Sequence, residues 1–484
     1  MSGLLVAGTT SDAGKSVVTT GLCRAFARRG IRVAPYKAQN MSNNSMVVGS
    51  RDVRCATSST TTFAEIGRAQ WVQAVAARVT PEPAMNPVLL KPGSDRRSHV
   101  VLMGRPTGEV SSRDWEDGRR HLAEAARAAY DDLAARFDVI VAEGAGSPAE
   151  INLRAGDYVN MGLARHADLP TIVVGDIDRG GVFAAMFGTV ALLEPADQAL
   201  VAGFVINKFR GEQALLAPGI DALTRMTGRP TYGVLPWSSE LWLDSEDALD
   251  LDGRRSSGTA AKKVAVVRLP RISNFTDLDA LGLEPDLDVR FVSGPRDLGD
   301  ADLVVLPGTR ATISDLAWMR ARGLDTAVIE HARRGRPVLG ICGGCQMLGR
   351  TIADPDGVEG PAGAVVAGLG LAGHTTTFAA DKTLRLHEPA GYEIHHGRVS
   401  GPTTSGEVVG TMVHGSLEDD TARATYLADA LGVTSRASFP AARERRIDLL
   451  ADLVEEHLDV DALLRLVRGG APAGLPVLPP GGMA

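Results

Sequence analysis

The chain has 484 residues, a formal net charge of −7, 44% hydrophobic residues and 23% charged residues. This length suggests roughly two to four domains of an ordinary globular protein, and the negative charge argues against a nucleic-acid or anionic membrane partner. No apolar run is long enough to span a bilayer, and the first residues lack the features of a signal peptide, so we expect a cytoplasmic protein. Four cysteines are too few for a disulfide framework, so each is expected to be catalytic, metal-binding or buried: Cys23, Cys55, Cys342 and Cys345.

Short apolar runs alternate with helical patterns through the first half of the chain. The runs that predict strands and the amphipathic stretches that predict helices are, respectively, 4–8, 31–35, 138–142, 170–175 and 201–206, and 16–29 and 123–136. This alternation predicts a mainly parallel sheet covered by helices on both faces. The polar segment Ser50–Thr62 is expected to form a surface loop, and 251–263 a linker.

The segment GTTSDAGKS, Gly8–Ser16, lies between the first predicted strand and the first predicted helix. Its glycines let backbone N–H groups point at phosphate oxygens, and the helix N-terminus adds positive potential. Lys15 would reach the outer phosphates and the Ser16 hydroxyl would bind Mg²⁺. A glycine-rich turn that only caps a helix is the alternative, but strand, loop, GKS and helix in this order favour phosphate binding. The predicted nucleotide contacts in the loop are Gly8, Asp12, Gly14, Lys15 and Ser16.

The loop has one more residue between Gly8 and Gly14 than the usual pattern, and this spacing resembles the dethiobiotin-synthetase branch of P-loop enzymes. The resemblance implies activation of carboxyl-type groups, and it implies that Lys37 in PYKAQN is a second lysine near the γ-phosphate. A solvated surface lysine is the alternative reading of Lys37. Glu143 directly follows a predicted strand, where a carboxylate faces the ligand crevice of an open α/β sheet, so it is a candidate Mg²⁺ ligand beside Ser16.

Three charged residues follow the next predicted strand in GDIDRGGVF. Asp176 or Asp178 could bind a metal or cationic groups, and Arg179 could hold a phosphate or a substrate carboxylate. Structural salt bridges are the competing explanation for these three residues.

The second half begins a new series of strands at 264–269, 303–306 and 337–341. The last of these runs into Cys342 within LGICGGCQMLG, a pattern typical of a nucleophile elbow, in which a tight strand-to-helix turn exposes the nucleophile and favours its thiolate. Cys342 and Cys345 also form C-x-x-C, but a zinc site would need further ligands and a redox pair fits the flanking glycines less well, so Cys345 is interpreted as an interior helix residue. Backbone N–H groups near Gly308 and at Gly343 could form an oxyanion hole, with an ordinary turn as the alternative for LPGTR.

The G-x-C-x-G-x-Q segment resembles the class I glutamine amidotransferases. The resemblance places a histidine in a G-T-x-x-H-G setting, which makes His414 the candidate base; His395 and His396 are the alternatives. Many such glutaminases carry glutamate two residues after the histidine, but Ser416 stands there in this sequence. The third member of a catalytic triad is therefore not at its usual position.

Several longer phrases, in order along nearly the whole chain, narrow the resemblance to the cobyric acid synthase family of cobalamin biosynthesis. They are PYKAQNMSNNS, EIGRAQ, MNPVLLKP, EGAGSPAEINL, GDIDRGGVF, NKFRG, LPRISNFTDLD, GICGG and GYEIHHG. The resemblance implies two α/β domains, a P-loop dethiobiotin-synthetase-like domain followed by a class I amidotransferase-like domain. The expected boundaries are 1–250 for the ATP-binding synthetase domain, 264–468 for the glutaminase domain, and 469–484 for a disordered tail.

The same resemblance implies amidation of the b, d, e and g carboxylates of adenosylcobyrinic acid a,c-diamide, with ATP, Mg²⁺ and glutamine as the nitrogen donor. Cobyrinic acid a,c-diamide synthase is the nearest alternative, and PYKAQNMSNNS and SPAEINL argue against it. Amidation of a cell-wall lipid precursor is disfavoured because that activity usually divides the two domains between chains. A non-catalytic P-loop switch would leave the cysteine elbow without a role. No oligomeric state is predicted.

Overall fold

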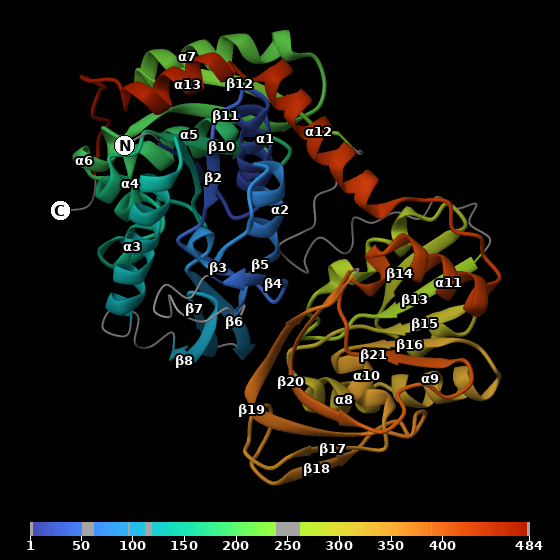
Figure 1. Ribbon diagram of the computed structural model, residues 1–484. Coiled ribbons are helices and arrows are strands. Elements are labelled where there is room, and N and C mark those ends of the chain that lie inside the picture. The colour runs from blue at the N-terminus through green and yellow to red at the C-terminus, as the bar shows by residue number, and fades with distance from the viewer. Residues whose placement is uncertain are drawn as a thin grey trace. The chain divides into compact units, whose positions relative to one another are not determined.

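A computed structural model describes residues 3–50, 62–94, 97–111, 119–238, 262–388 and 390–481 (Figure 1). The chain divides into two compact units. Unit 1 comprises Met1–Met41, Ile66–Leu243 and Glu444–Ala484, and unit 2 comprises Ser42–Glu65 and Asp244–Arg443. Within the described ranges, no helix combines the length and the apolar character needed to cross a membrane.

Unit 1 is built on a six-stranded sheet in the order β12-β11-β10-β1-β9-β2, and every neighbouring pair is parallel. Its strands are β1 (Gly3–Gly8), β2 (Val33–Tyr36), β9 (Val139–Glu143), β10 (Thr171–Asp176), β11 (Val201–Phe209) and β12 (Thr231–Pro236). The predicted parallel sheet is therefore confirmed. Because β1 lies between β9 and β10, the strand order reverses beside it, and ligands bind at such positions in open α/β sheets.

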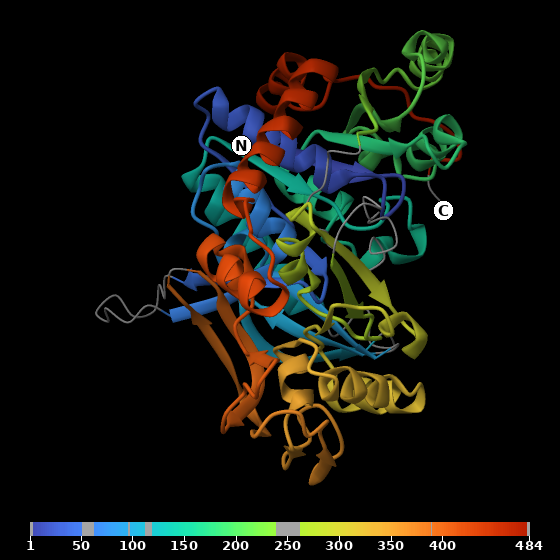
Figure 2. The same cartoon turned by 90° about the vertical axis from the view of Figure 1, so that its right-hand side faces the viewer.

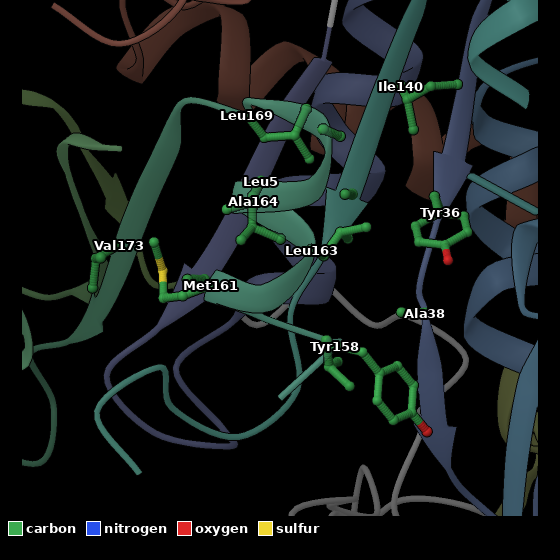
Figure 3. Packing of buried hydrophobic residues seen from close by; sticks show 14 of the residues in the cluster. Leu5, Tyr36, Ala38, Ile140, Tyr158, Met161, Leu163, Ala164, Leu169 and Val173 are labelled. Atoms are coloured by element: carbon green, nitrogen blue, oxygen red, sulfur yellow. The ribbon is translucent and has the colours of Figure 1, made fainter. Parts of the chain in front are cut away.

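Helices cover both faces of this sheet because successive strand residues point to opposite sides. On one face, Leu5, Ile140 and Val173 of the strands pack with Met161 and Leu163 in a single apolar cluster (Figure 3). The helices on this face are α3 (Arg120–Arg136), α4 (Met161–Ala167) and α5 (Val182–Ala191). The helices on the other face are α1 (Lys15–Arg28), α2 (Arg68–Ala76), α12 (Phe439–His457) and α13 (Val460–Gly469).

Unit 1 also carries a second, four-stranded sheet in the order β3-β6-β7-β8. Its strands are β3 (Gln39–Met41), β6 (Val88–Ser94), β7 (Arg97–Leu102) and β8 (Arg105–Ser111). The remaining helical segments of unit 1 are η1 (Pro83–Met85), η3 (Ile151–Gly156), α6 (Pro195–Gln198), η4 (Gln213–Leu216) and α7 (Ala217–Thr227).

Unit 2 contains a five-stranded parallel sheet in the order β14-β13-β15-β16-β21 and a mixed sheet in the order β18-β17-β19-β20. The parallel strands are β13 (Lys262–Val267), β14 (Leu287–Val292), β15 (Leu303–Leu306), β16 (Val338–Ile341) and β21 (Val408–Thr411). The others are β17 (Thr351–Asp354), β18 (Ala364–Ala367), β19 (Thr375–Leu386) and β20 (Tyr392–Ser400).

The helical segments of unit 2 are η6 (Phe275–Leu278), η7 (Leu281–Leu283), η8 (Pro295–Leu298), α8 (Thr312–Ala321), α9 (Leu324–Arg333), α10 (Gly343–Leu348), η9 (Ser416–Glu418) and α11 (Asp420–Leu431). Helices α8, α9 and α10 pack on one face of the parallel sheet in a common apolar core. The predicted second α/β region is confirmed.

A segment of the first half of the chain, Ser42–Glu65, belongs to unit 2 and not to the expected ATP-binding domain 1–250. Strands β4 (Ser45–Ser50) and β5 (Thr62–Gly67) pair with each other. The physical reason lies in their contacts: the buried Glu65 carboxylate accepts a hydrogen bond from Lys382 Nζ at 2.5 Å. The predicted surface loop Ser50–Thr62 and the predicted linker 251–263 lie outside the described residues, except for residues 50, 62, 262 and 263 at their ends.

The second difference concerns the end of the chain, which belongs to unit 1 from Glu444 onward. The buried Arg24 of α1 pairs with Glu444 at 2.7 Å and with Asp448 at 3.0 Å, and Figures 1 and 2 both show the red α12–α13 segment on the α1 side of the sheet. The tail that we expected to be disordered is described as far as residue 481. Leu478 is buried because the Gln198 side chain binds both its N–H and its carbonyl oxygen, at 2.7 and 2.9 Å.

Candidate active sites

The first candidate site is the loop between β1 and α1. Gly14 adopts φ +99° at the start of α1, and a Cβ there would lie 1.9 Å from Asn207 Nδ2, so only glycine fits. Lys15 is buried, and its ammonium group donates to the carbonyl oxygens of Thr10 at 2.8 Å and Gly146 at 3.1 Å. The ammonium group is therefore enclosed by the backbone of the loop, where it could neutralise the negative charge of a bound phosphate.

Glu143 joins the predicted nucleotide residues of unit 1. Its Oε1 accepts hydrogen bonds from Ser16 Oγ at 2.9 Å and Lys37 Nζ at 3.0 Å, and its Oε2 accepts one from Gln73 at 2.5 Å. Burial acts to raise the pKa of the Glu143 carboxyl, but Lys37, Gln73 and Lys15 outweigh it, so the pKa is lowered and the group is a carboxylate. Three of the residues singled out in the sequence are thus brought together at the carboxyl end of the sheet.

The other charged residues near the loop pair mainly with one another. Asp12 is half exposed and accepts a hydrogen bond from Arg179 at 2.7 Å, so its side chain is engaged in an ion pair. Asp176 lies 2.7 Å from Lys208 Nζ, and Asp178 lies 3.6 Å from Arg210. These contacts favour the structural interpretation of Asp176 and Asp178. Among the predicted site residues, Lys15, Ser16 and Lys37 instead gather around Glu143.

The second candidate site is the turn between β16 and α10. Cys342 itself adopts φ 50° and ψ −107°, a conformation that non-glycine residues rarely take and that signals stored strain. The surrounding structure holds it there: the Cys342 N–H donates to the Thr411 carbonyl oxygen at 2.8 Å, and a Cβ on Gly344 would lie 1.9 Å from the Leu306 carbonyl oxygen. This is the strand, turn and short helix expected of a nucleophile elbow.

His414 lies beside the elbow because β21 pairs with β16, and His414 follows β21 by three residues. The ring is buried, stacks on Tyr392 with centroids 5.4 Å apart, and its Nδ1 lies 2.6 Å from Asp277 Oδ2. Burial acts to lower the pKa of His414, but Asp277 and Cys342 outweigh it and raise the pKa well above its ordinary value.

Asp277 is an acidic residue in contact with His414 that was not predicted from the sequence. It lies in η6, after β13, and its Oδ1 also accepts the Gly415 N–H at 2.8 Å. It occurs in the phrase LPRISNFTDLD, but its contact with His414 could not be recognised there because 137 positions separate the two residues. Ser416, at the position where a glutamate was expected, begins the short helix η9.

Gly308 and Gly343 both lie close to this group. A Cβ on Gly308 would lie 3.0 Å from His414 Cε1, and a Cβ on Gly343 would lie 3.0 Å from the Thr309 backbone nitrogen. The two loops therefore approach each other beside Cys342, at a separation that only residues without side chains allow.

The two alternative histidines and the other cysteines have different contacts from His414 and Cys342. His395 contacts Glu393 at 3.2 Å, and His396 contacts the Ala379 carbonyl oxygen at 3.1 Å; burial lowers the pKa of both, that of His396 to about 4. Cys345 is fully buried in α10, and burial raises its pKa to about 12, as expected for an interior helix residue. Cys23 is buried in the core of unit 1, whereas Cys55 lies outside the described residues.

An elbow cysteine with a buried His–Asp pair, and a phosphate loop in the other unit, are the parts of a glutamine amidotransferase joined to a nucleotide-binding domain. Comparison with known families agrees: residues 263–427 match the CobB/CobQ-like glutamine amidotransferase domain, and residues 4–250 match the CobQ/CobB/MinD/ParA nucleotide binding domain. The protein is an ATP-using glutamine amidotransferase of the ligase class.

The chain is similar along its full length to several cobyric acid synthases. The chain is 70% identical to the one of Mycolicibacterium vanbaalenii, with 99% of this chain and 100% of the relative covered. It is 69% identical to that of Mycolicibacterium gilvum and 68% identical to that of Mycobacterium ulcerans, with the same coverage. The chain belongs to the cobyric acid synthase family.

Proposed function

We propose that the protein converts the b, d, e and g carboxylates of adenosylcobyrinic acid a,c-diamide to carboxamides. Each conversion would use one ATP and one glutamine. The proposal is supported by 70% sequence identity to a cobyric acid synthase over 99% of the chain. It is also supported by two candidate sites, one suited to releasing ammonia from glutamine and one suited to binding a nucleotide.

In the first step, a substrate carboxylate oxygen attacks the γ-phosphorus of ATP. The bond between γ-phosphorus and the β-phosphate oxygen breaks, ADP leaves, and the product is an acyl phosphate. This step is needed because a carboxylate oxygen is a poor leaving group toward ammonia. Lys15 and Lys37 would neutralise the charge that develops on the transferring phosphoryl group, and positioning supplies most of the remaining acceleration.

Ser16 and Glu143 are the residues that fit a Mg²⁺ ion. Both offer hard oxygen ligands, and Ser16 Oγ lies 2.9 Å from Glu143 Oε1. The buried Gln73 Oε1 has no hydrogen-bond partner within the described residues, so it could accept from a water bound to the ion. Mg²⁺ sites of this kind are usually completed by substrate phosphates and water. When bound, Mg²⁺ would neutralise phosphate charge.

In the second site, the Cys342 thiolate attacks the side-chain amide carbon of glutamine. The C–N bond breaks, His414 gives its proton to the departing ammonia, and a γ-glutamyl thioester remains. Water then attacks the thioester with His414 as the base, which releases glutamate and restores the thiol. Asp277 would hold the imidazole in one orientation and stabilise its charged form. N–H groups at Gly308 and Gly343 would bind the oxyanion.

Ammonia from the second site attacks the acyl phosphate, and phosphate leaves to give the carboxamide. The test is mass spectrometry of the corrinoid after incubation with glutamine and ATP. We expect a replacement of OH by NH₂ at each of the b, d, e and g positions. Turnover of cobyrinic acid alone, at the a and c positions, would instead identify the protein as a cobyrinic acid a,c-diamide synthase.

A further inference from the structure

The Ser42–Ser45 turn is encoded in the first half of the chain but belongs to unit 2. Three of its four residues are almost completely buried, with 3% of Ser42, 2% of Asn44 and 1% of Ser45 exposed, and Asn43 is partly buried. The turn is internally braced, because Ser42 Oγ accepts the Asn44 N–H at 3.0 Å. Buried amides of this kind require defined hydrogen-bond partners.

Two hydrogen bonds join this turn to the start of η6. Asn44 Oδ1 accepts the Phe275 N–H at 3.2 Å, and Asn274 Oδ1 accepts the Ser45 N–H at 2.9 Å. Each asparagine thus binds a backbone N–H of the other's segment. This reciprocal arrangement fixes both the position and the rotation of the segment that contains Asn274 and Phe275.

The segment needs such support because Asn274 adopts φ 48° and ψ 39°, a left-handed conformation. Residues in this region persist when the surrounding structure determines them. The Asp277 N–H in turn donates to the Asn274 carbonyl oxygen at 3.0 Å, so the left-handed residue sets where the Asp277 carboxylate lies. That carboxylate contacts both His414 Nδ1 and the Gly415 N–H.

We infer that Asn44 and Asn274 are positioning residues for the glutaminase reaction. They place Asp277, and through it the His414 imidazole, so that glutamine hydrolysis depends on a turn encoded in the nucleotide-binding half of the sequence. The inference rests on the proposed roles of Cys342, His414 and Asp277.

The test uses the full chain and compares glutamine with saturating ammonia as the nitrogen source. Asn44→Ala removes the acceptor for the Phe275 N–H, and we expect kcat with glutamine to fall about tenfold while KM for glutamine changes less than about twofold. Asn274→Gly tolerates the left-handed conformation but removes the other acceptor, so it should show a similar loss. Amidation from ammonia should be unchanged in both variants.

Asn44→Asp keeps the acceptor oxygen and should recover most of the lost kcat. The matched control is Ser435→Ala, which removes a hydrogen bond to Glu284 at 2.6 Å in the same unit and should leave kcat unchanged. Unchanged kcat with glutamine in Asn44→Ala, or equal losses with glutamine and ammonia, would overturn the positioning role. A separate failure, in which Cys342→Ala still uses glutamine, would overturn the glutaminase assignment itself.

Discussion

Both candidate sites begin at the carboxyl end of a parallel strand and continue into a helix, β1 into α1 and β16 into α10. In the phosphate loop, a glycine holds the unusual backbone conformation, Gly14 at φ +99°, so Lys15 and Ser16 lie in ordinary helical geometry after it. In the elbow, the proposed nucleophile itself adopts the unusual backbone conformation, with Cys342 at φ 50°. A phosphate site needs backbone N–H groups that converge on the ligand, so the unusual conformation can lie on a glycine of the loop. A nucleophile needs its own side chain exposed at the turn, so the backbone strain lies on the nucleophile itself.

The two sites also differ in how their charged groups are gathered. Lys15 and Ser16 are neighbours in the chain, and only Lys37 and Glu143 must be brought in by the adjacent strands β2 and β9. The cysteine site is assembled from segments after β13, β16 and β21. We therefore expect substitutions at the cysteine site to reduce amidation from glutamine only, and substitutions at the phosphate loop to reduce amidation from both glutamine and ammonia.

The largest effect is expected for Cys342→Ala. Glutamine-driven amidation should fall by a factor on the order of 10⁴ or more, because the variant lacks the thiol on which the proposed thioester forms. Amidation from high concentrations of ammonia should continue at the wild-type rate. The measurement is corrinoid product formed with each nitrogen source, and loss of both activities in a folded variant would contradict the separation of the two sites.

Lys15→Ala should have the complementary effect. Amidation should fall by a factor on the order of 10³ with either nitrogen source, because charge neutralisation at the transferring phosphoryl group is lost. Release of glutamate from glutamine by Cys342 should persist, and this can be measured without any corrinoid. A Lys15→Ala variant that amidates normally with ammonia would show that the loop has no role in activation.

Asp277→Asn should lower kcat with glutamine by a factor on the order of 10² and leave ammonia-driven amidation intact. Its pH dependence gives a further check. Asp277 helps to raise the pKa of His414, so the imidazolium persists to higher pH in the wild type than it would without the carboxylate. The alkaline limb of kcat/KM for glutamine should therefore move to lower pH in the variant, and an unmoved limb would contradict the role of Asp277.

The smallest effect on activity is expected at the end of the chain. Leu478→Ala removes a buried side chain from unit 1 and should lower the free energy of unfolding by about 2–3 kcal/mol, measured by denaturant titration. The rate of amidation at low temperature should be unchanged with either glutamine or ammonia. Val477→Ala is the matched control, because Val477 is 55% exposed and its truncation should change stability little.

Local sequence determined much of this protein. Strand, loop and helix follow one another within a few residues at GTTSDAGKS and at GICGGCQ, so residue order alone predicts the geometry of each turn. The alternation of strands and helices similarly predicts the two parallel sheets. Glu143 could be selected because it follows a strand that was predicted from its apolar run, whereas Lys37 was selected through the resemblance to the dethiobiotin-synthetase branch.

Only the tertiary structure decided which distant segments meet. Asp277 contacts His414 because of strand order in a sheet, and nothing in the sequence around Asp277 records that neighbour. The Ser42–Ser45 turn and the chain from Glu444 onward belong to units other than those expected. Contacts such as those of Asn44 with Phe275 and of Arg24 with Asp448 join residues that are far apart in the sequence. Backbone turns depend on neighbouring residues, whereas pairing between remote side chains depends on the packing of the whole unit.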